Sequence, residues 1–294
     1  MNDFIKDLLK DKTIFIVSDL HMGDGSPRDN FKKHKQRFID FLDYVEKIPN
    51  SAIVLAGDTL ELWQCELGDV VKEYFGIIKR LIKMNAIFLI GNHDIDLHGF
   101  VNMPINELLG IPDLPMSFEI FKCMAENIEF EREGQKFMIM HGHEFDVFND
   151  PDKAIATGKI LALLVGLMET SYGAENEKID IEWRLRDIFE PFFRGLISMF
   201  TKLYKIFYAT TVGNCIKNGK SLNEMYNNIF DFHYKYPESF LIFGHTHKKG
   251  WIENWCVNDG AWWIDNASYI KIDRDSNVEL YSWPENKKLE NQLR

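Results

Sequence analysis

The 294-residue sequence predicts an α/β fold with two sheets and flanking helices. Short apolar runs bounded by glycine or polar residues recur along it, as in buried strands. Between several of these runs the apolar residues take helical spacing, and the C-terminal part returns to strand-like segments. With 46% hydrophobic and 27% charged residues, the composition fits a soluble globular protein with one large domain, or a domain plus an insertion.

Five apolar runs of four or five residues predict buried strands, and each leads into aspartate, asparagine or histidine. The runs cover residues 14–17, 52–56, 86–90, 137–140 and 240–243. Ligands of α/β folds gather at the carboxyl ends of such strands. We therefore expect the polar residues after the five runs to converge on one site.

Apolar residues at helical spacing predict helices over 31–48 and 70–84, and closing strands are expected over 262–269 and 278–283. Residues 151–235 are predicted to be mostly helical, with segments over 155–168, 179–193, 196–212 and 221–236. This block separates the fourth polar motif from the fifth. We interpret residues 1–150 and 236–294 as the main domain and 151–235 as a helical insertion, a cap or lid beside the active site.

The residues that follow the five runs form a set of candidate metal ligands: Asp19, His21, Asp58, Asn92, His141, His245 and His247. Imidazole mixed with carboxylate and amide oxygen suits Mn, Fe or Zn better than Mg or Ca. Seven ligands are too many for one tetrahedral ion, but they suit two ions that share one carboxylate. Asp58 stands alone after its strand, between the two histidine-bearing halves, and is our candidate bridge. Two such metals clamp a phosphoryl group and generate hydroxide at neutral pH.

The motifs Asp19-Leu-His21, Gly57-Asp58, Gly91-Asn92-His93-Asp94, His141-Gly-His143 and Gly244-His245-Thr-His247 resemble, in order, those of the calcineurin-like metallophosphoesterase superfamily. Each dyad alone could be a turn or a helix cap, but the joint set indicates a metal site. The resemblance implies a four-layer α/β/β/α sandwich. It also implies that Asp19, His21 and His247 hold one metal, that Asn92, His141 and His245 hold the second, and that Asp58 bridges them.

The resemblance further implies that His93 is catalytic and not a ligand. It would reach the phosphoryl oxygen or the leaving group, with Asp94 orienting its ring. As hydroxide between the metals attacks phosphorus in line, a cationic imidazole stabilises the developing charge or protonates the leaving alkoxide.

Other polar residues near the motifs are candidates for contact with substrate or ligands. Arg28 would hold a second phosphate bidentately, or it is a solvated loop residue. His143 would support the ligands or contact substrate. Glu61, three residues after Asp58, would accept a proton from a ligand imidazole, or it begins a helix. Trp63 would line the pocket or pack under it.

The segment from Gly57 to Trp63 and the loop after His21 resemble the branch that contains UDP-2,3-diacylglucosamine hydrolase, which cleaves a nucleotide-sugar pyrophosphate. The chain departs from that branch at His93, where arginine is expected, and at His143, where aspartate is expected. We thus expect a metal-dependent phosphoesterase that cleaves a phosphoester or pyrophosphate bond of a nucleotide- or lipid-linked substrate.

Alternatives within the superfamily are a phosphomonoesterase, a phosphoprotein phosphatase or a cyclic nucleotide phosphodiesterase. A non-catalytic scaffold stabilised by metal is the alternative from another class. The presence of all seven candidate ligands and of His93 argues against it.

The formal net charge of −11 disfavours binding to nucleic acid, which requires a basic face. Four cysteines without CxxC spacing indicate reduced thiols, and the sequence shows no signal peptide or membrane-spanning run, so we expect a cytoplasmic protein. Residues 192–220 contain five basic residues, no acidic one and many aromatics. This segment would either lie on anionic lipid, as a peripheral membrane contact, or pack its apolar stripe on the core.

Overall fold

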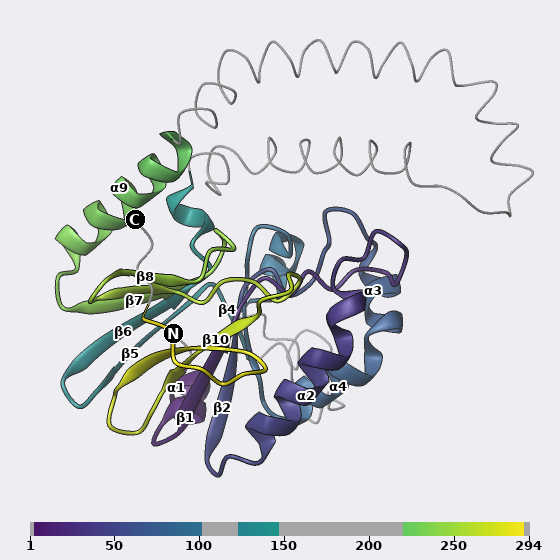
Figure 1. Cartoon of the computed structure of the whole chain (residues 1–294), viewed down its shortest axis with the longest axis horizontal. Helices are drawn as coiled ribbons and strands as arrows, with labels where there is room; N and C mark the ends of the chain where they lie inside the picture. Colours follow the sequence, from purple (N-terminus) through teal and green to yellow (C-terminus); the bar gives the residue numbers. More distant parts are fainter. Residues whose placement is uncertain (1–2, 102–122, 147–219, 291–294) are drawn as a thin grey trace, which may run out of the picture.

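The computed structural model describes residues 3–101, 123–146 and 220–290. Within them, two sheets lie between layers of helices (Figure 1). The first sheet has the strand order β11-β10-β1-β2-β3-β4, and the second has the order β5-β6-β7-β9-β8. The first sheet is built from β1 (Thr13–Val17), β2 (Ser51–Ala56), β3 (Ile87–Leu89), β4 (Met124–Ala125), β10 (Ser268–Ile272) and β11 (Val278–Ser282). The second is built from β5 (Asn127–Arg132), β6 (Gln135–Met140), β7 (Ser239–Phe243), β8 (Gly250–Glu253) and β9 (Cys256–Asn258).

Both sheets have a parallel centre. Strands β1 to β4 run parallel, with Ile14 opposite Ala52 and Leu55 opposite Phe88, while β10 returns antiparallel beside β1. In the second sheet β6, β7 and β9 are parallel, with antiparallel β5 and β8 at the edges. The five strands expected from the apolar runs are β1, β2, β3, β6 and β7. Their parallel arrangement brings the carboxyl ends within each sheet to one edge.

Three apolar layers separate the four layers of secondary structure. One layer, with Phe38 and Phe41, lies between the first sheet and α2 (Lys35–Glu46), α3 (Leu67–Glu73) and α4 (Phe75–Lys83). A second, with Ile16 and Ile139, lies between the two sheets, and a third, with Ile229, lies between the second sheet and α9 (Lys220–Lys235). The order of layers confirms the expected α/β/β/α sandwich (Figure 1).

The expected helices are present, with one interruption. Helix α2 buries Phe38, Phe41, Leu42 and Val45 on one face, and each such side chain contributes about 1.5–3 kcal/mol by leaving water. The segment predicted as one helix over 70–84 is two helices, because Tyr74 leaves helical geometry at φ −106° and ψ 20°. Its hydroxyl donates to Asp29 in the neighbouring loop.

Helix α9 is the predicted helix over 221–236, and it covers the outer face of the second sheet. The rest of the predicted insertion, 151–219, lies outside the described residues, as does the aromatic segment 192–219. A short helix α1 (Asp3–Leu9) precedes β1.

The strand predicted over 262–269 is wrong for its first six residues. Residues 262–267 form a loop, and β10 begins at Ser268. Two contacts hold this loop out of the sheet. The Trp262 amide donates to the Asp19 carbonyl at 3.0 Å, and the Arg37 guanidinium takes the carbonyls of Trp262 and Ile264. Carbonyls bound to a side chain are not available to a neighbouring strand.

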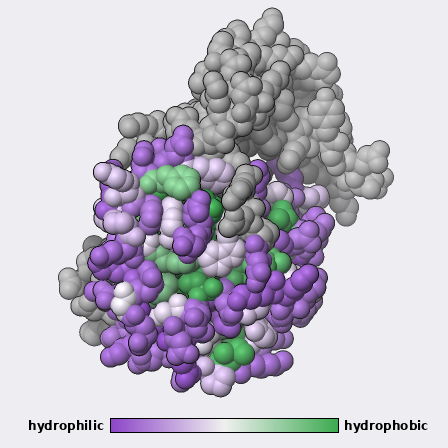
Figure 2. Space-filling view, turned by 60° about the vertical axis from the view of Figure 1, so that its left-hand side comes forward, coloured by the Kyte–Doolittle hydropathy of each residue, from purple (hydrophilic) through white to green (hydrophobic). Residues whose placement is uncertain are grey.

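The visible surface in Figure 2 is mainly hydrophilic, with small hydrophobic patches, as the charged composition suggests. None of the helices in the described ranges has the length and apolarity needed to span a membrane. Cys65, Cys123 and Cys256 are free thiols, as expected, and Cys215 lies outside the described residues.

Candidate metal centre

The five strand ends converge, and both sheets contribute to one centre. The candidate ligand atoms of Asp19, His21 and His247 lie within 4.8 Å of one another, and so do those of Asp58, His141 and His245. Asn92 joins the second group, because its Oδ1 lies 3.1 Å from Nε2 of His141. All seven predicted ligands are therefore brought together.

In the first group, Nε2 of His247 lies 3.1 Å from Oδ1 of Asp19. Nε2 of His21 lies 3.7 Å from Oδ1 of Asp19 and 3.7 Å from Oδ2 of Asp58. Oδ1 of Asp19 and Nε2 of His21 are buried, and neither has a hydrogen-bond partner among the described residues. Buried polar atoms are normally paired, so these two point to a partner of another kind, and a divalent cation fits a carboxylate facing an imidazole.

In the second group, Nε2 of His141 lies 3.2 Å from Oδ2 of Asp58. The other ring nitrogen, Nδ1, lies 2.9 Å from the Ala56 carbonyl, which can only accept a hydrogen bond, so Nδ1 carries a proton and Nε2 is the nitrogen that faces Asp58. Nε2 of His245 lies 3.1 Å from Oδ2 of Asp146. Oδ2 of Asp58 faces imidazoles of both groups, which is the position that a bridging carboxylate requires.

The backbone at the centre is held in an uncommon conformation. Asp19, His21, Asp58, His245 and His247 all have positive φ, between 50° and 64°. Non-glycine residues rarely adopt this region, and they persist in it only where the surroundings enforce it. Here backbone hydrogen bonds do so, because the amides of Asp19 and His21 donate to the carbonyls of Gly57 and Asp58 at 3.1 Å and 2.9 Å. Gly57 itself, at φ 92°, has no room for a Cβ, which would meet the His141 ring.

Opposite charges stabilise the buried groups. Burial would raise the pKa of Asp58, but the nearby His141 imidazole holds it well below the usual range. Burial would likewise lower the pKa of His141, and the Asp58 carboxylate raises it to about 10. A cluster that keeps its carboxylates ionised is suited to bind cations, which would replace the imidazole protons.

Comparison with known proteins bears on this centre. A family model described as calcineurin-like phosphoesterase matches residues 12–249 of the 294. The chain belongs to the calcineurin-like phosphoesterase family. It is accordingly a metal-dependent phosphoesterase, and the groups of candidate ligands are those available for its divalent metals.

Several solved structures resemble this phosphoesterase at low identity. A Vps29 single mutant from Entamoeba histolytica has 11% identity and a TM-score of 0.40, and the match covers 95% of this chain and 99% of that one. A novel archaeal phosphodiesterase has 14% identity and a TM-score of 0.37, covering 92% and 99%. A conserved uncharacterized protein from Streptococcus pneumoniae TIGR4 has 13% identity and a TM-score of 0.34, covering 95% and 98%. No curated protein matches the chain.

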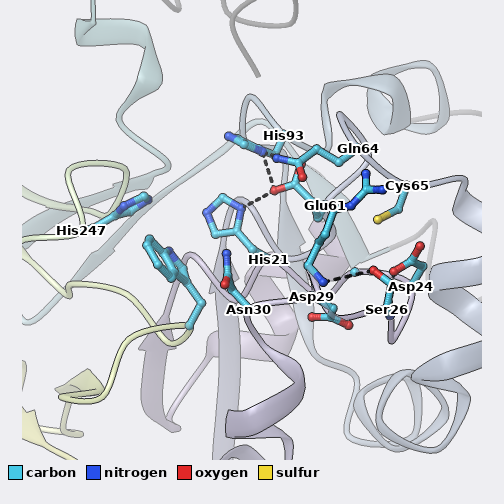
Figure 3. Close-up of a pocket in the computed structure, with 13 residues that line it drawn as sticks. His21, Asp24, Ser26, Asp29, Asn30, Glu61, Gln64, Cys65, His93 and His247 are labelled. Carbon is cyan, nitrogen blue, oxygen red and sulfur yellow. Dashed lines mark hydrogen bonds and ion pairs between the residues drawn. The ribbon is translucent and has the colours of Figure 1, made fainter. Parts of the chain in front are cut away.

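His93 lies beside the two groups of predicted ligands, and its ring forms a third group of candidate ligand atoms with His21 and Asp58. Nδ1 of His93 lies 2.8 Å from both oxygens of Glu61, and the ring stacks on Trp63 with centroids 4.0 Å apart. The His93 amide donates to Oδ1 of Asp58 at 2.8 Å. Since Glu61 takes Nδ1, Nε2 is the nitrogen left to face a substrate. In Figure 3 dashed lines join the Glu61 carboxylate to both His93 and His21.

Glu61 holds two imidazoles at once. Its Oε2 also lies 3.0 Å from Nδ1 of His21, which directs Nε2 of that ring toward Asp19 and Asp58. This contact confirms the expected pairing of Glu61 with a ligand imidazole, and the alternative of a helix start is wrong, because α3 begins at Leu67. Burial would raise the pKa of Glu61, but the hydrogen bonds to His21 and His93 lower it to about 2.

Asp94 has partners other than the expected one. Its carboxylate accepts hydrogen bonds from the amides of Gly91 at 2.6 Å and Thr59 at 2.8 Å, and it is 2% exposed. It thus ties the loop after β3 to the loop after β2, while Glu61, and not the expected Asp94, pairs with the His93 ring. Burial and the Asp58 charge raise the pKa of Asp94 to about 6.

A pocket of about 230 Å³ opens beside His21, His93 and His247 (Figure 3). Arg28 lines it, as expected for a substrate contact, together with Asn30, Gln64, Cys65 and Trp263. His143 is not among the lining residues. It is buried with its ring 5.4 Å from that of His141 and 6.4 Å from that of His245, and burial lowers its pKa to about 4.

Trp263, Asp146 and Arg37 were not recognised from the sequence. Trp263 stands edge-on to His247, with centroids 5.3 Å apart and an interplanar angle of 87°. Asp146 approaches His245 from 99 residues away. Of these three residues, only Trp263 could have been found from the sequence. Two adjacent tryptophans in a polar segment near the last strands suggest that one of them is exposed for binding.

Proposed function

We propose that this phosphoesterase hydrolyses a phosphoester or pyrophosphate bond with two divalent transition-metal ions, of which manganese suits the ligand set best. The observation that carries the proposal is the position of Asp58 between two groups of candidate ligands that are buried or half-buried. When bound, such ions neutralise phosphoryl charge and activate the attacking water.

The residues of the chain then have distinct tasks. Asp19, His21 and His247 would hold one ion, Asn92, His141 and His245 the other, and Asp58 both. Nε2 of His93 would donate to the phosphoryl oxygen or the leaving group, while Glu61 and Trp63 fix the ring against rotation. Asp94 would keep the loop that carries Asn92 and His93 in place.

The pocket supports a substrate with more than a simple phosphoryl group. Beside His93 it presents a guanidinium, two carboxamides and an indole, from Arg28, Asn30, Gln64 and Trp263. Asp29, although it lines the pocket, is engaged by the amides of Gly25 and Phe31 at 2.9 Å and 3.0 Å, so it holds the Arg28 loop. Donors of this kind suit a phosphorylated small molecule with further oxygen-rich groups.

We propose a nucleotide- or lipid-linked substrate of the type of UDP-2,3-diacylglucosamine, acted on in the cytoplasm or at a membrane surface. The resemblance of the segment from Gly57 to Trp63 supports this choice, and Arg28, which lines the pocket, would bind a second phosphate. A membrane contact through 192–220 belongs to the same proposal.

The test measures p-nitrophenol release from bis-p-nitrophenyl phosphate with and without added Mn²⁺. We expect turnover that requires metal and vanishes in Asp58→Ala. Competing substrates are then ranked by kcat/KM: UDP-2,3-diacylglucosamine, p-nitrophenyl phosphate, a phosphopeptide and a cyclic nucleotide. Protein that binds metal and turns over none of these would be a scaffold, and the proposal would fail. A higher kcat/KM for one of the last three would move the function to the corresponding alternative.

A further inference from the structure

The Asp146 carboxylate contacts the ring of one predicted metal ligand, His245. It follows a short 3-10 helix, η4 (His143–Phe145), that begins two residues after His141. The Asp146 amide donates to the His143 carbonyl at 3.0 Å, which fixes the end of this turn. Oδ2 of Asp146 lies 3.1 Å from Nε2 of His245, and the two side chains are only 21% and 10% exposed.

A neutral imidazole has one N–H and one lone pair, and a metal takes the lone pair. Where a carboxylate is not itself a candidate ligand of the same cation, the imidazole nitrogen beside it carries the N–H, because the carboxylate can only accept. For His245 this nitrogen is Nε2, which leaves the lone pair on Nδ1.

The backbone geometry is consistent with Nδ1 as the ligand atom. Nδ1 is the ring nitrogen nearer the main chain, and the main chain of His245 is at the centre, since its amide donates to Oδ2 of Asp19 at 3.0 Å. Asp146 is not part of the group of ligand atoms formed by Asp58, His141 and His245. The Asp146 carboxylate therefore contacts the side of the His245 ring that faces away from the other candidate ligands, and it is not a candidate ligand itself.

The other two imidazoles with a carbonyl or carboxylate behind them face the opposite way. His21 pairs Nδ1 with Glu61, and His141 pairs Nδ1 with the Ala56 carbonyl, so both present Nε2 to the centre. Among these three ligands, His245 is the one that pairs through Nε2 with a group outside the ligand set.

We infer that Asp146 is a positioning residue that fixes the tautomer and orientation of His245, so that this ligand binds the second metal through Nδ1. Groups behind a metal ligand typically change metal affinity by about 10–100-fold when removed. The inference rests on the two-metal site proposed above.

The experiment uses full-length protein stripped of metal and titrated calorimetrically with Mn²⁺ and with Zn²⁺. Asp146→Asn keeps the shape of the side chain and removes its charge, and Asp146→Ala removes the acceptor. We expect the affinity of one site to fall about 10–100-fold in Asp146→Ala, less in Asp146→Asn, with the other site within about twofold of the wild type. Glu238→Gln is the control for loss of one negative charge, because Glu238 is an exposed residue paired with Lys136.

A direct readout is the two-bond ¹H–¹⁵N spectrum of the Zn²⁺-loaded protein with labelled histidines. His245 should show a metal-bound Nδ1 and a protonated Nε2, and His21 and His141 the reverse. A metal-bound Nε2 in His245, unchanged affinity in both Asp146 variants, or equal weakening of both sites would overturn the inference. Wild-type protein that binds a single ion would instead refute the two-metal site itself.

Discussion

Asp58→Ala should abolish the stabilisation that metal gives to this protein, and not merely weaken it. Asp58 is 1% exposed, and its Oδ2 lies 3.7 Å from Nε2 of His21 and 3.2 Å from Nε2 of His141. It is thus next to both groups of candidate ligands. Asn92 touches only the second group, through Nε2 of His141. Asn92→Ala should therefore affect one ion, and Asp58→Ala both.

The magnitude follows from mass action. A site held at 100 times its Kd stabilises the folded state by about 2.7 kcal/mol, so two sites contribute about 5 kcal/mol. At about 2 °C per kcal/mol for a domain of this size, metal should raise the Tm of the wild type by roughly 10 °C. The rise should be roughly 5 °C in Asn92→Ala and close to zero in Asp58→Ala.

Thermal unfolding with and without Mn²⁺, together with elemental analysis, checks this series. Glu238→Gln should keep the full shift, because its carboxylate is on the surface. If Asp58→Ala retained half of the shift and one bound ion, Asp58 would belong to a single site and the reasoning about a shared carboxylate would be refuted.

Three further substitutions distinguish a residue that supports metal binding from one that acts on the substrate and from one that orders the loop carrying Trp263. His93→Ala should keep both metals and lose about 10²–10⁴-fold in kcat, measured by elemental analysis and initial rates, and an emptied site would show that His93 is a ligand. Glu61→Gln should weaken metal binding about tenfold and also lower kcat, because Glu61 holds both His21 and His93, so excess metal should restore occupancy but not the full rate. Arg37→Met should lower the free energy of unfolding by about 1–3 kcal/mol and raise KM, since the loop that carries Trp263 loses its charged anchor, and an unchanged KM would argue against a role of Trp263 in binding.

The strands and the seven candidate ligands could be predicted from the sequence because both signals are local. A run such as 14–17 is apolar enough to be buried on both faces, and the polar residues that follow it have no place in a buried strand. The rule that ligands collect at the carboxyl ends of strands then brings together residues as distant as Asp19 and His247. No information about side-chain direction was needed for that step.

What could not be predicted depends on how loops pass one another. Asp94 and Glu61 are both acids near His93, and the sequence does not say which one meets the ring. Asp94 turns back to the amides of Gly91 and Thr59, while Glu61 enters from the loop after β2. Likewise, nothing local marks Arg37 as the residue that takes the carbonyls of the loop after Asn258 and so prevents an earlier start of β10.

The two sheets explain why metal binding and folding should be so closely linked here. Asp19, His21, Asp58 and Asn92 follow strands of the first sheet, whereas His141, His245 and His247 follow strands of the second. Two of the candidate metal groups, Asp19 with His21 and His247 and Asp58 with His141 and His245, mix ligands from both sheets. Between the sheets, apolar side chains such as Ile16 and Ile139 pack without directionality, and a few hydrogen bonds cross near the centre, such as the one from Nδ1 of His141 to the Ala56 carbonyl. An ion in either group would join the two sheets at their carboxyl ends with directional bonds. It would also hold strand ends whose positive φ values are unfavourable on their own.

Unfolding must separate the sheets, so the free energy of metal binding should appear in the stability of the whole domain and not only in local order around the site.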